Sequence, residues 1–309
     1  MLSKFKLGLI AFLTVGLLVA CSTESPTSGD EDEGKDDGEI HIGLAVSTQN
    51  NPFFVTLKEG AEAKADELGV ELTVVDAQDD AATQLSSIED LIQQDIDVLV
   101  VNPTDSEAVV SAIETANDAG IPVVTVDRSA DGGEVVAHVA SDNVDGGEMA
   151  GNFIVEQLGG EGNVVELEGI PGSSAARERG EGFHNIVDEE SGIEVVAQQP
   201  ADFERSEGLT VMENIIQSNS DFDAVFAHND EMALGALEAL EAAGMEDVIV
   251  VGFDATDDAV AAVEAGTLDA TVAQQPAIIG EQGIEVAVSI ANGEEVEEFL
   301  PVELDLITE

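Results

Sequence analysis

The sequence predicts an α/β protein built from two doubly wound parallel sheets. Short apolar runs rich in Val and Ile alternate along the chain with longer amphipathic stretches. Continuous runs of this kind are typical of parallel strands covered by helices on both faces, and the intervening helices form right-handed crossovers. About ten such runs follow residue 40, more than one sheet of this kind usually holds. We therefore expect two lobes of similar design.

The first 20 residues have the pattern of an export signal. Lys4 and Lys6 precede an apolar run from Leu7 to Ala20, and this run is short for a bilayer span, which needs about 20 apolar residues. The segment ends in Leu-Val-Ala-Cys, which resembles the lipobox of bacterial lipoproteins. The resemblance implies that Cys21 becomes the lipidated first residue of the mature protein. An uncleaved membrane anchor with an incidental cysteine is the alternative.

Residues 21–39 are predicted to form a disordered acidic tether. From position 22 to position 39 there is no large apolar residue and there are eight acidic ones. Such a segment stays solvated and extended by self-repulsion. We expect a body that faces the periplasm or the extracellular side and touches the membrane only through its lipid.

The folded body is expected to begin at residue 40. Its first half carries apolar runs at 42–46, 72–75, 98–101 and 123–126, and its second half carries runs at 163–167, 193–197, 224–227, 248–251 and 270–273. No glycine-rich phosphate fingerprint follows the first run, where the sequence reads STQNNPFF. A nucleotide-binding Rossmann domain is therefore disfavoured.

The composition excludes several classes of function. The 309 residues include 66 Asp and Glu against 9 Lys and Arg, a formal net charge of −57. A chain this acidic lacks the cations that nucleic acids and anionic lipids require, while 44% hydrophobic residues argue against a disordered protein. One Cys and 4 scattered His exclude an internal disulfide and predict neither a metal site nor a cofactor.

Polar and aromatic side chains recur directly after the predicted strands. Because ligands of open parallel sheets bind at the carboxyl ends of the strands, this recurrence predicts a binding site at one end of both sheets. Taken singly, the Asn and Asp residues could be ordinary helix caps and turn residues. The residues concerned are Ser47, Asn51, Phe53, Phe54, Asn102, Asp127, Arg128, Asn229, Asp230, Asp254 and Gln274.

Only six cations follow the tether, and four of them are arginines. A guanidinium holds two acceptors in register, which Lys cannot do. We expect Arg128 and Arg179 to serve a ligand, whereas Arg177 and Arg205 serve either a ligand or surface ion pairs, which contribute little to stability.

Several longer segments closely resemble bacterial ribose-binding proteins, members of the periplasmic-binding-protein family. The most specific are SAARERGEGF (174–183) and HNDEMALGAL (228–237), and VSTQNNPFF (46–54), VDRSADGGEVVAHVASDN (126–143) and VVGFDAT (250–256) support them. The resemblance covers the chain from residue 40 to the last strand. It implies two lobes joined by a three-segment hinge, with residues 40–141 plus 275–303 in the N-terminal lobe and 142–274 plus 304–309 in the C-terminal lobe.

The resemblance also implies the contacts of a sugar bound between the lobes. Three aromatic rings would sandwich the sugar: Phe53, Phe54 and Phe203. Seven polar side chains would bond its hydroxyls: Asn51, Asp127, Arg128, Arg179, Asn229, Asp254 and Gln274. A second tier would line the pocket: Ser47, Asn102, Ser141 and Ile170. The chain departs from the family pattern at Gln49, around residues 188–192 and in its acidity.

The chemistry of these residue types suits a sugar. Flat rings cover apolar C–H faces, and charged or amide groups make strong directed bonds to hydroxyls. Phe53 and Phe54 are adjacent, so we expect that both cannot face one core and that at least one of them faces outward.

The predicted function is a non-enzymatic receptor that captures ribose, closes by a hinge and docks on an ABC-type sugar permease. The resemblance also allows a chemoreceptor as a partner and favours a monomer. Within the receptor class, allose, another pentose or a furanosyl signalling molecule are alternative ligands.

Two other classes of protein stay open at this point. A LacI-type regulator would need an N-terminal helix-turn-helix with basic residues, where this chain has a signal and an acidic tether. A glycoside hydrolase could use Asp127 and Asp254 as its paired carboxylates. We expect Arg128 to lower the pKa of Asp127, which is the wrong direction for a general acid. The acidic surface itself indicates a halophilic host, because concentrated salt screens self-repulsion.

Overall fold

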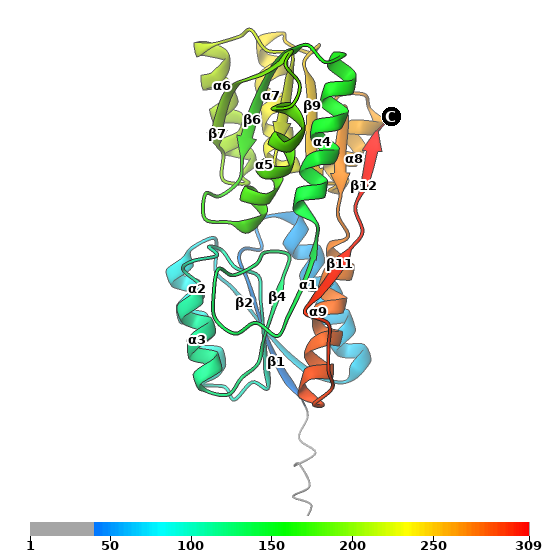
Figure 1. Cartoon of the computed structure of the whole chain (residues 1–309). Coiled ribbons are helices and arrows are strands. Elements are labelled where there is room, and N and C mark those ends of the chain that lie inside the picture. Colours follow the sequence, from blue (N-terminus) through cyan, green and yellow to red (C-terminus); the bar gives the residue numbers. More distant parts are fainter. Residues whose placement is uncertain (1–39, 309) are drawn as a thin grey trace, which may run out of the picture. The chain divides into compact units, whose positions relative to one another are not determined.

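The computed structural model describes residues 40–308. The predicted signal peptide, the lipidation site at Cys21 and the tether lie outside this range. The described residues belong to one compact unit that contains two six-stranded sheets (Figure 1).

The N-terminal lobe is built on a sheet of strand order β11-β5-β4-β3-β1-β2, in which every neighbouring pair is parallel. Its elements are β1 (His41–Val46), α1 (Pro52–Leu68), β2 (Glu71–Asp76), α2 (Ala81–Ile92), β3 (Val98–Val101), α3 (Val110–Asp118), β4 (Val123–Val126), β5 (Ala137–Ser141), α9 (Pro276–Ala291) and β11 (Phe299–Val302).

The C-terminal lobe repeats the design with the order β12-β10-β9-β8-β6-β7, in which only β12 runs antiparallel to its neighbour. Its elements are α4 (Asn143–Leu158), β6 (Gly162–Glu168), α5 (Ser174–Val187), β7 (Ile193–Pro200), α6 (Arg205–Ser218), β8 (Ala224–Ala227), α7 (Asp230–Ala243), β9 (Ile249–Asp254), α8 (Asp257–Glu264), β10 (Ala270–Ala273) and β12 (Asp305–Thr308).

Two doubly wound lobes are therefore confirmed, but the expected number of strands was too low. The described residues form 12 strands rather than about ten. The strands that the apolar runs do not mark are β5, β11 and β12. β5 carries a histidine and a serine, β11 contains Pro301, and β12 begins with Asp305 and ends with Thr308, so none of them forms a continuous run of Val and Ile.

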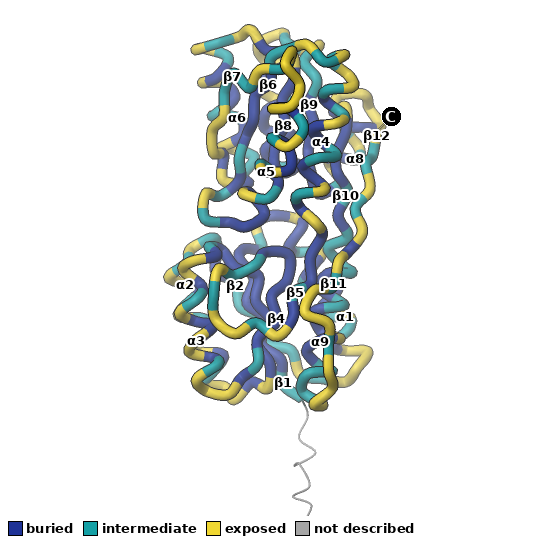
Figure 2. Tube along the Cα trace, in the orientation of Figure 1, coloured by how far each residue is buried: buried dark blue, intermediate teal, exposed yellow. Residues whose placement is uncertain are grey.

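The central strands are buried on both faces, as continuous apolar runs require. Every residue of β3, β4 and β8 is buried (Figure 2). Helices α1 and α9 pack closely on one another over the N-terminal sheet, because Gly60 lies against the backbone of Ala277 and a Cβ there would overlap it. The counterpart in the C-terminal lobe is the pair α4 and α5.

The chain passes between the two sheets three times, which confirms the three-segment hinge. The passages are the connections from β5 to α4, from β10 to α9 and from β11 to β12. Among residues 40–308, none of the helices combines the length and the apolar character needed to cross a membrane.

Two helix starts already bear on function. The Asn51 side chain accepts a hydrogen bond of 2.9 Å from the Phe53 N–H and so caps α1, where Pro52 occupies the first turn. Asn229 caps α7 in the same way through the Met232 N–H, at 3.0 Å. The caps satisfy backbone donors that the first turn leaves free, so both asparagines are fixed at the carboxyl ends of their preceding strands.

Candidate functional site

A small cavity lies between the two lobes at the carboxyl ends of their strands. The space left in it is about 10 Å³, room for about one water molecule. The structure brings all ten predicted ligand-binding residues together around it, with Ala175 as an additional member. The lining is Asn51, Phe53, Phe54, Asp127, Arg128, Ala175, Arg179, Phe203, Asn229, Asp254 and Gln274.

Both lobes supply aromatic walls to this cavity. Phe53 and Phe54 lie edge to face with their ring centroids 5.1 Å apart, and Phe203 comes from the C-terminal lobe. The expectation that the two adjacent rings cannot share one core is wrong, since both belong to the core of the N-terminal lobe. Adjacent helical positions differ by about 100°, and the apolar stripe of a core-facing helix is that wide. The two rings therefore serve the core and the cavity together.

Arg128 reaches across the cavity from the N-terminal lobe. Its guanidinium carbon lies 5.0 Å from the centroid of the Phe54 ring and 5.1 Å from that of Phe203. Nη1 donates to the Pro103 carbonyl at 3.4 Å, Nε lies 3.7 Å from Asp127 Oδ2, and Nε has no hydrogen-bond partner. Burial lowers the pKa of Arg128, so this cation lacks full compensation.

Arg179 is held more completely. Its Nε donates to Asn143 Oδ1 at 2.9 Å and its Nη1 to the His228 carbonyl at 2.6 Å. The guanidinium carbon lies 3.8 Å from the centroid of the Phe253 ring, and Nη1 lies 3.6 Å from Asp254 Oδ1. These contacts fix the plane of the guanidinium at the cavity wall.

The two carboxylates of the cavity are as buried as the arginines, at 4% exposure for Asp127 and 5% for Asp254. Burial raises the pKa of Asp127, while Arg128 and Arg179 only partly oppose this. Arg128 thus lowers the pKa of Asp127 as expected, but the expected net direction is wrong, because desolvation outweighs the neighbouring charge. Burial likewise raises the pKa of Asp254 well above its usual value, against the opposing charge of Arg179.

Gln274 completes the hydrogen-bonding surface. Its Nε2 donates to Asp254 Oδ1 at 2.8 Å, whereas its buried Oε1 has no partner. Together with Nε of Arg128, the cavity thus holds one unsatisfied acceptor and one unsatisfied donor. Buried polar groups left unpaired cost about 1–3 kcal/mol each, so a ligand that supplies both partners is favoured.

The backbone of the site is strained at three of the lining residues. Asp127, Phe203 and Asp254 have φ of 61°, 62° and 119°, in a region that residues other than Gly seldom adopt. Each such residue costs on the order of 1–3 kcal/mol and persists only where its surroundings hold it. The strained backbone positions therefore coincide with residues that line the cavity.

The four second-tier residues lie behind the cavity rather than in its lining. Asn102 accepts from the Ser47 N–H at 3.1 Å and donates to Asp127 Oδ2 at 3.1 Å, so it orients that carboxylate. Ser141 is buried at the end of β5, and Ile170 packs against the core of the C-terminal lobe.

The remaining arginines form surface pairs. Arg177 bonds Asp131 at 2.9 Å, and Arg205 bonds Glu231 at 2.8 Å and Asp258 at 2.9 Å. Neither arginine lines the small cavity.

The lobes touch one another directly beside this cavity. The Ser106 N–H donates to the Gly172 carbonyl at 3.0 Å, and the Ser129 N–H donates to Ser174 Oγ at 2.9 Å. A Cβ at Gly172 would overlap the Asp105 carboxylate of the other lobe. The structure is thus a closed arrangement.

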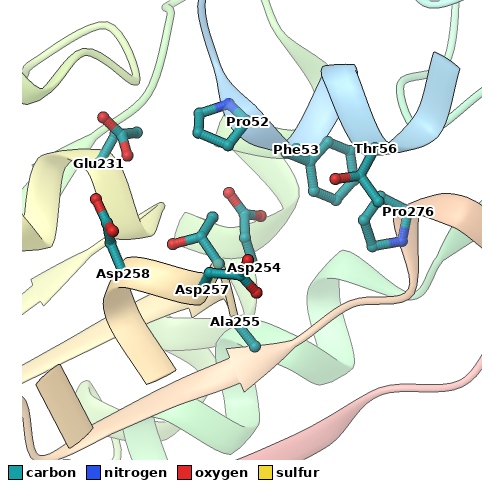
Figure 3. Close-up of a pocket in the computed structure, with 10 residues that line it drawn as sticks. Pro52, Phe53, Thr56, Glu231, Asp254, Ala255, Asp257, Asp258 and Pro276 are labelled. Carbon is teal, nitrogen blue, oxygen red and sulfur yellow. The ribbon is translucent and has the colours of Figure 1, made fainter. Parts of the chain in front are cut away.

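A larger cavity of about 340 Å³ adjoins the first and shares Phe53 and Asp254 with it. Figure 3 shows carboxylates of the C-terminal lobe, among them Glu231 and Asp258, on one wall and Pro52 with Phe53 from α1 on the other. This wider space is the acidic side of the interlobe cleft.

No group of three or more His, Cys, Asp or Glu within residues 40–308 has the arrangement of a metal site. Three residues of the site were not predicted from the sequence. Ala175 lines the cavity, and Asn143 and Phe253 contact Arg179. Asn143 and Phe253 hold Arg179 from elements remote in sequence, so no local signal marks them.

Two lobes that close on a small cavity with aromatic walls and buried, hydrogen-bonding charges define a solute-binding protein. A family model described as periplasmic binding protein domain matches residues 42–295. The chain belongs to this family.

Named relatives agree with this assignment. The chain is 52% identical over 306 residues to a protein of Bacillus subtilis named ribose import binding protein, covering 99% of each chain. It is 53% identical over 266 residues to the protein of that name from Escherichia coli, covering 86% of this chain and 90% of the relative.

Solved structures resemble the whole described body. A solute-binding protein of Bacillus halodurans with bound myo-inositol has a TM-score of 0.85 at 38% identity and covers 88% of this chain and 96% of its own. One from Actinobacillus succinogenes with bound D-allose has a TM-score of 0.82 at 31% identity and covers 87% and 98%.

Proposed function

We propose that this protein is an extracytoplasmic receptor that captures D-ribose, or a close monosaccharide, between its lobes and delivers it to an ABC sugar permease. The observation that carries the proposal is the small cavity itself, with Phe rings on both sides and buried Arg, Asp, Asn and Gln between them. The names of the relatives that are 52–55% identical support ribose as the ligand. Their description as import binding proteins sets the enzyme and regulator alternatives aside.

Each part of the cavity matches a feature of a pentose. The rings of Phe53, Phe54 and Phe203 would cover the C–H faces, a contact worth about 1 kcal/mol beyond its area. Hydroxyls both donate and accept, so they can satisfy the free Oε1 of Gln274 and the free Nε of Arg128 at once. An epimer that misplaces one hydroxyl would leave a buried group unpaired, at a cost of about 1–3 kcal/mol.

Capture follows from the placement of these groups on two bodies. Asp127 and Arg128 belong to the N-terminal lobe, whereas Arg179, Asn229 and Asp254 belong to the C-terminal lobe. A sugar that bonds to both sets binds the closed arrangement more tightly than the open one, and this difference in affinity drives closure. The permease then meets a closed, loaded receptor.

The ligand assignment is tested by calorimetric titration against a panel of monosaccharides. Ribose should bind more tightly than xylose, arabinose, allose and myo-inositol, and the last two are included because structural relatives hold them. Asp254→Ala should abolish binding without unfolding the protein. Equal affinity for ribose, xylose and arabinose would contradict ribose as the ligand. Wild-type affinity of Asp254→Ala would show that the binding site lies elsewhere.

The membrane attachment is a separate part of the proposal. A lipid on Cys21 would hold the receptor at the cell envelope on the tether of residues 21–39, as a monomer close to its permease. A chemoreceptor is a further partner that the closed form could serve. Cys21→Ser should move the protein from the membrane fraction to the soluble fraction and abolish incorporation of labelled fatty acid; a variant that stays lipidated would contradict the assignment.

The acidic surface is better explained as an adaptation to the surrounding salt than as a feature that serves the ligand. A neutral sugar does not call for a net charge of −57, whereas molar salt screens such self-repulsion over a few ångströms. We therefore assign the protein to a halophilic host.

A further inference from the structure

A buried carboxylate lies immediately behind the binding cavity without lining it. Asp230 is the first residue of α7 and is 0% exposed. Its Oδ2 accepts hydrogen bonds from the Thr256 N–H at 2.7 Å and from the Thr256 hydroxyl at 3.2 Å. Its Oδ1 accepts from the Thr271 hydroxyl at 2.7 Å. All three donors are neutral groups, so the carboxylate is anchored without a cation among these partners.

Thr271 links Asp230 to one further backbone group. While its hydroxyl donates to Asp230, the same oxygen accepts from the Ala255 N–H at 3.2 Å. Asp230 and Thr271 together thus receive the N–H groups of two successive residues, Ala255 and Thr256. The space is tight, since a Cβ at Gly252 would overlap Asp230 Oδ1.

The two anchored N–H groups belong to the turn that brings Asp254 to the ligand. Asp254 and Ala255 have φ of 119° and 55°, and both values are costly for residues other than Gly. The turn takes the chain out of β9 and leaves Asp254 Oδ1 2.8 Å from Gln274 Nε2 and 3.6 Å from Arg179 Nη1. A conformation of this kind persists only when neighbouring groups hold it.

We infer that Asp230 and Thr271 are positioning residues that hold the strained turn and so preset the Asp254 carboxylate for the sugar. Only a carboxylate can accept from all three donors at once, because an amide at this place would turn an N–H₂ group toward one of them. The inference rests on the proposed function, and it explains a buried acid that does not line the cavity. Burial raises the pKa of Asp230 to about 7, because desolvation outweighs the hydrogen bonds from Thr271 and Thr256.

The test compares isosteric variants by calorimetric titration with D-ribose. Asp230→Asn and Thr271→Val should each weaken binding about tenfold to a hundredfold, the effect of leaving one buried polar group unpaired. Thr271→Ser keeps the hydroxyl and should stay within about threefold of the wild type. Because both residues hold one turn, the double variant Asp230→Asn/Thr271→Val should lose much less than the product of the two single losses.

A matched control separates positioning from general stability. Asp223 accepts the Asn163 N–H at 2.8 Å at the opposite end of β8, so Asp223→Ala, which removes this acceptor, should lower the melting temperature without changing the affinity. If Asp230→Asn fails to fold, the comparison of Thr271→Val with Thr271→Ser decides alone.

The outcomes are distinguishable. If the wild type binds ribose and the Thr271→Val variant binds it with equal affinity, the positioning role is overturned and the proposed function stays intact. The positioning role is also overturned if Asp223→Ala loses as much affinity as Asp230→Asn. A wild type that binds no monosaccharide overturns the proposed function, and the inference falls with it.

Discussion

The guanidinium of Arg179 lies against the ring of Phe253, with its central carbon 3.8 Å from the ring centroid. Hydrogen bonds to Asn143 and to the His228 carbonyl fix the same group along its edge. Face and edge are both occupied by protein, so the side chain enters the cavity in a single orientation. An Arg held in this way is prepared to receive a ligand without ordering costs at the moment of binding.

Replacement of Arg179 by Lys should therefore disable the site although the charge is kept. An ammonium cannot stack on Phe253 and bond two acceptors in one plane, and the loss of one charged hydrogen bond costs about 1.5–3 kcal/mol. We expect ribose affinity to fall at least tenfold by titration calorimetry. Arg205→Lys is the matched control, because Arg205 pairs with Glu231 and Asp258 of its own lobe and does not line the small cavity; it should bind as the wild type does. Equal losses in the two variants would contradict the special role of Arg179.

Substitution of Gly172 by Ala should weaken binding by hindering closure. The added methyl would overlap the Asp105 carboxylate of the opposite lobe, so it penalises only the arrangement in which the lobes meet. We expect lower ribose affinity and a smaller ribose-induced decrease of the radius of gyration in X-ray scattering, with an unchanged melting temperature in the absence of sugar. Asp105→Ser in the same chain should restore both quantities. Full compaction of Gly172→Ala by ribose would show that the lobes close differently.

Stability should depend on the protonation of His184. Its ring contacts the buried Glu166 at 3.0 Å and Asp188 at 3.1 Å. Burial alone would lower the pKa of His184, but its hydrogen bonds and charge interactions with these two carboxylates outweigh burial and raise it. A raised pKa in the folded state means that the stabilisation is complete below the unfolded value of about 6.5 and is lost as the pH rises through the folded value.

Urea unfolding of the wild type and of His184→Gln measures this effect. The stability advantage of the wild type should be larger at about pH 6 than at about pH 8. The buried carboxylates also favour the folded state at lower pH, but they are present in both proteins and cancel in the difference. An advantage that grows with pH would show that His184 acts mainly through its neutral form.

Salt should raise the stability of the protein far more than that of an ordinary domain. Self-repulsion of the acidic surface is screened over about 10 Å at 0.1 M salt and about 3 Å at 1 M. We expect the melting temperature to rise steeply between about 0.1 M and about 3 M KCl. A flat profile would mean that the acidic surface is not an adaptation to salt.

The residues that line the small cavity could be predicted because many of them obey a positional rule. Asn51, Asp127 and Asn229 each follow a strand and Asp254 ends one, and parallel strands end at one edge of their sheet. The recognisable segments added Arg179 and Phe203, which lie on α5 and before α6 and have no such positional signal.

What the sequence could not supply is burial and the contacts that depend on it. The pKa of Asp127 was predicted in the wrong direction because a sequence shows the neighbouring Arg128 but not the desolvation that outweighs it. The support of Arg179 by Asn143 joins residues 36 positions apart, and its stacking on Phe253 joins two different elements. Neither contact has a local pattern.

The order in which this chain is made differs from the order in which it can fold. Helix α9 supplies Ile279, Ile284 and Ala287 to the core of the N-terminal lobe, and β11 extends the sheet of that lobe. Both are encoded after the whole of β6 to β10. The lobe that a ribosome or a secretion channel releases first must therefore wait, with its core incomplete, until the other lobe has emerged. A chaperone that delays collapse during export suits this design, and a stalled or truncated chain would expose the apolar faces of β3, β4 and β5 that α9 covers.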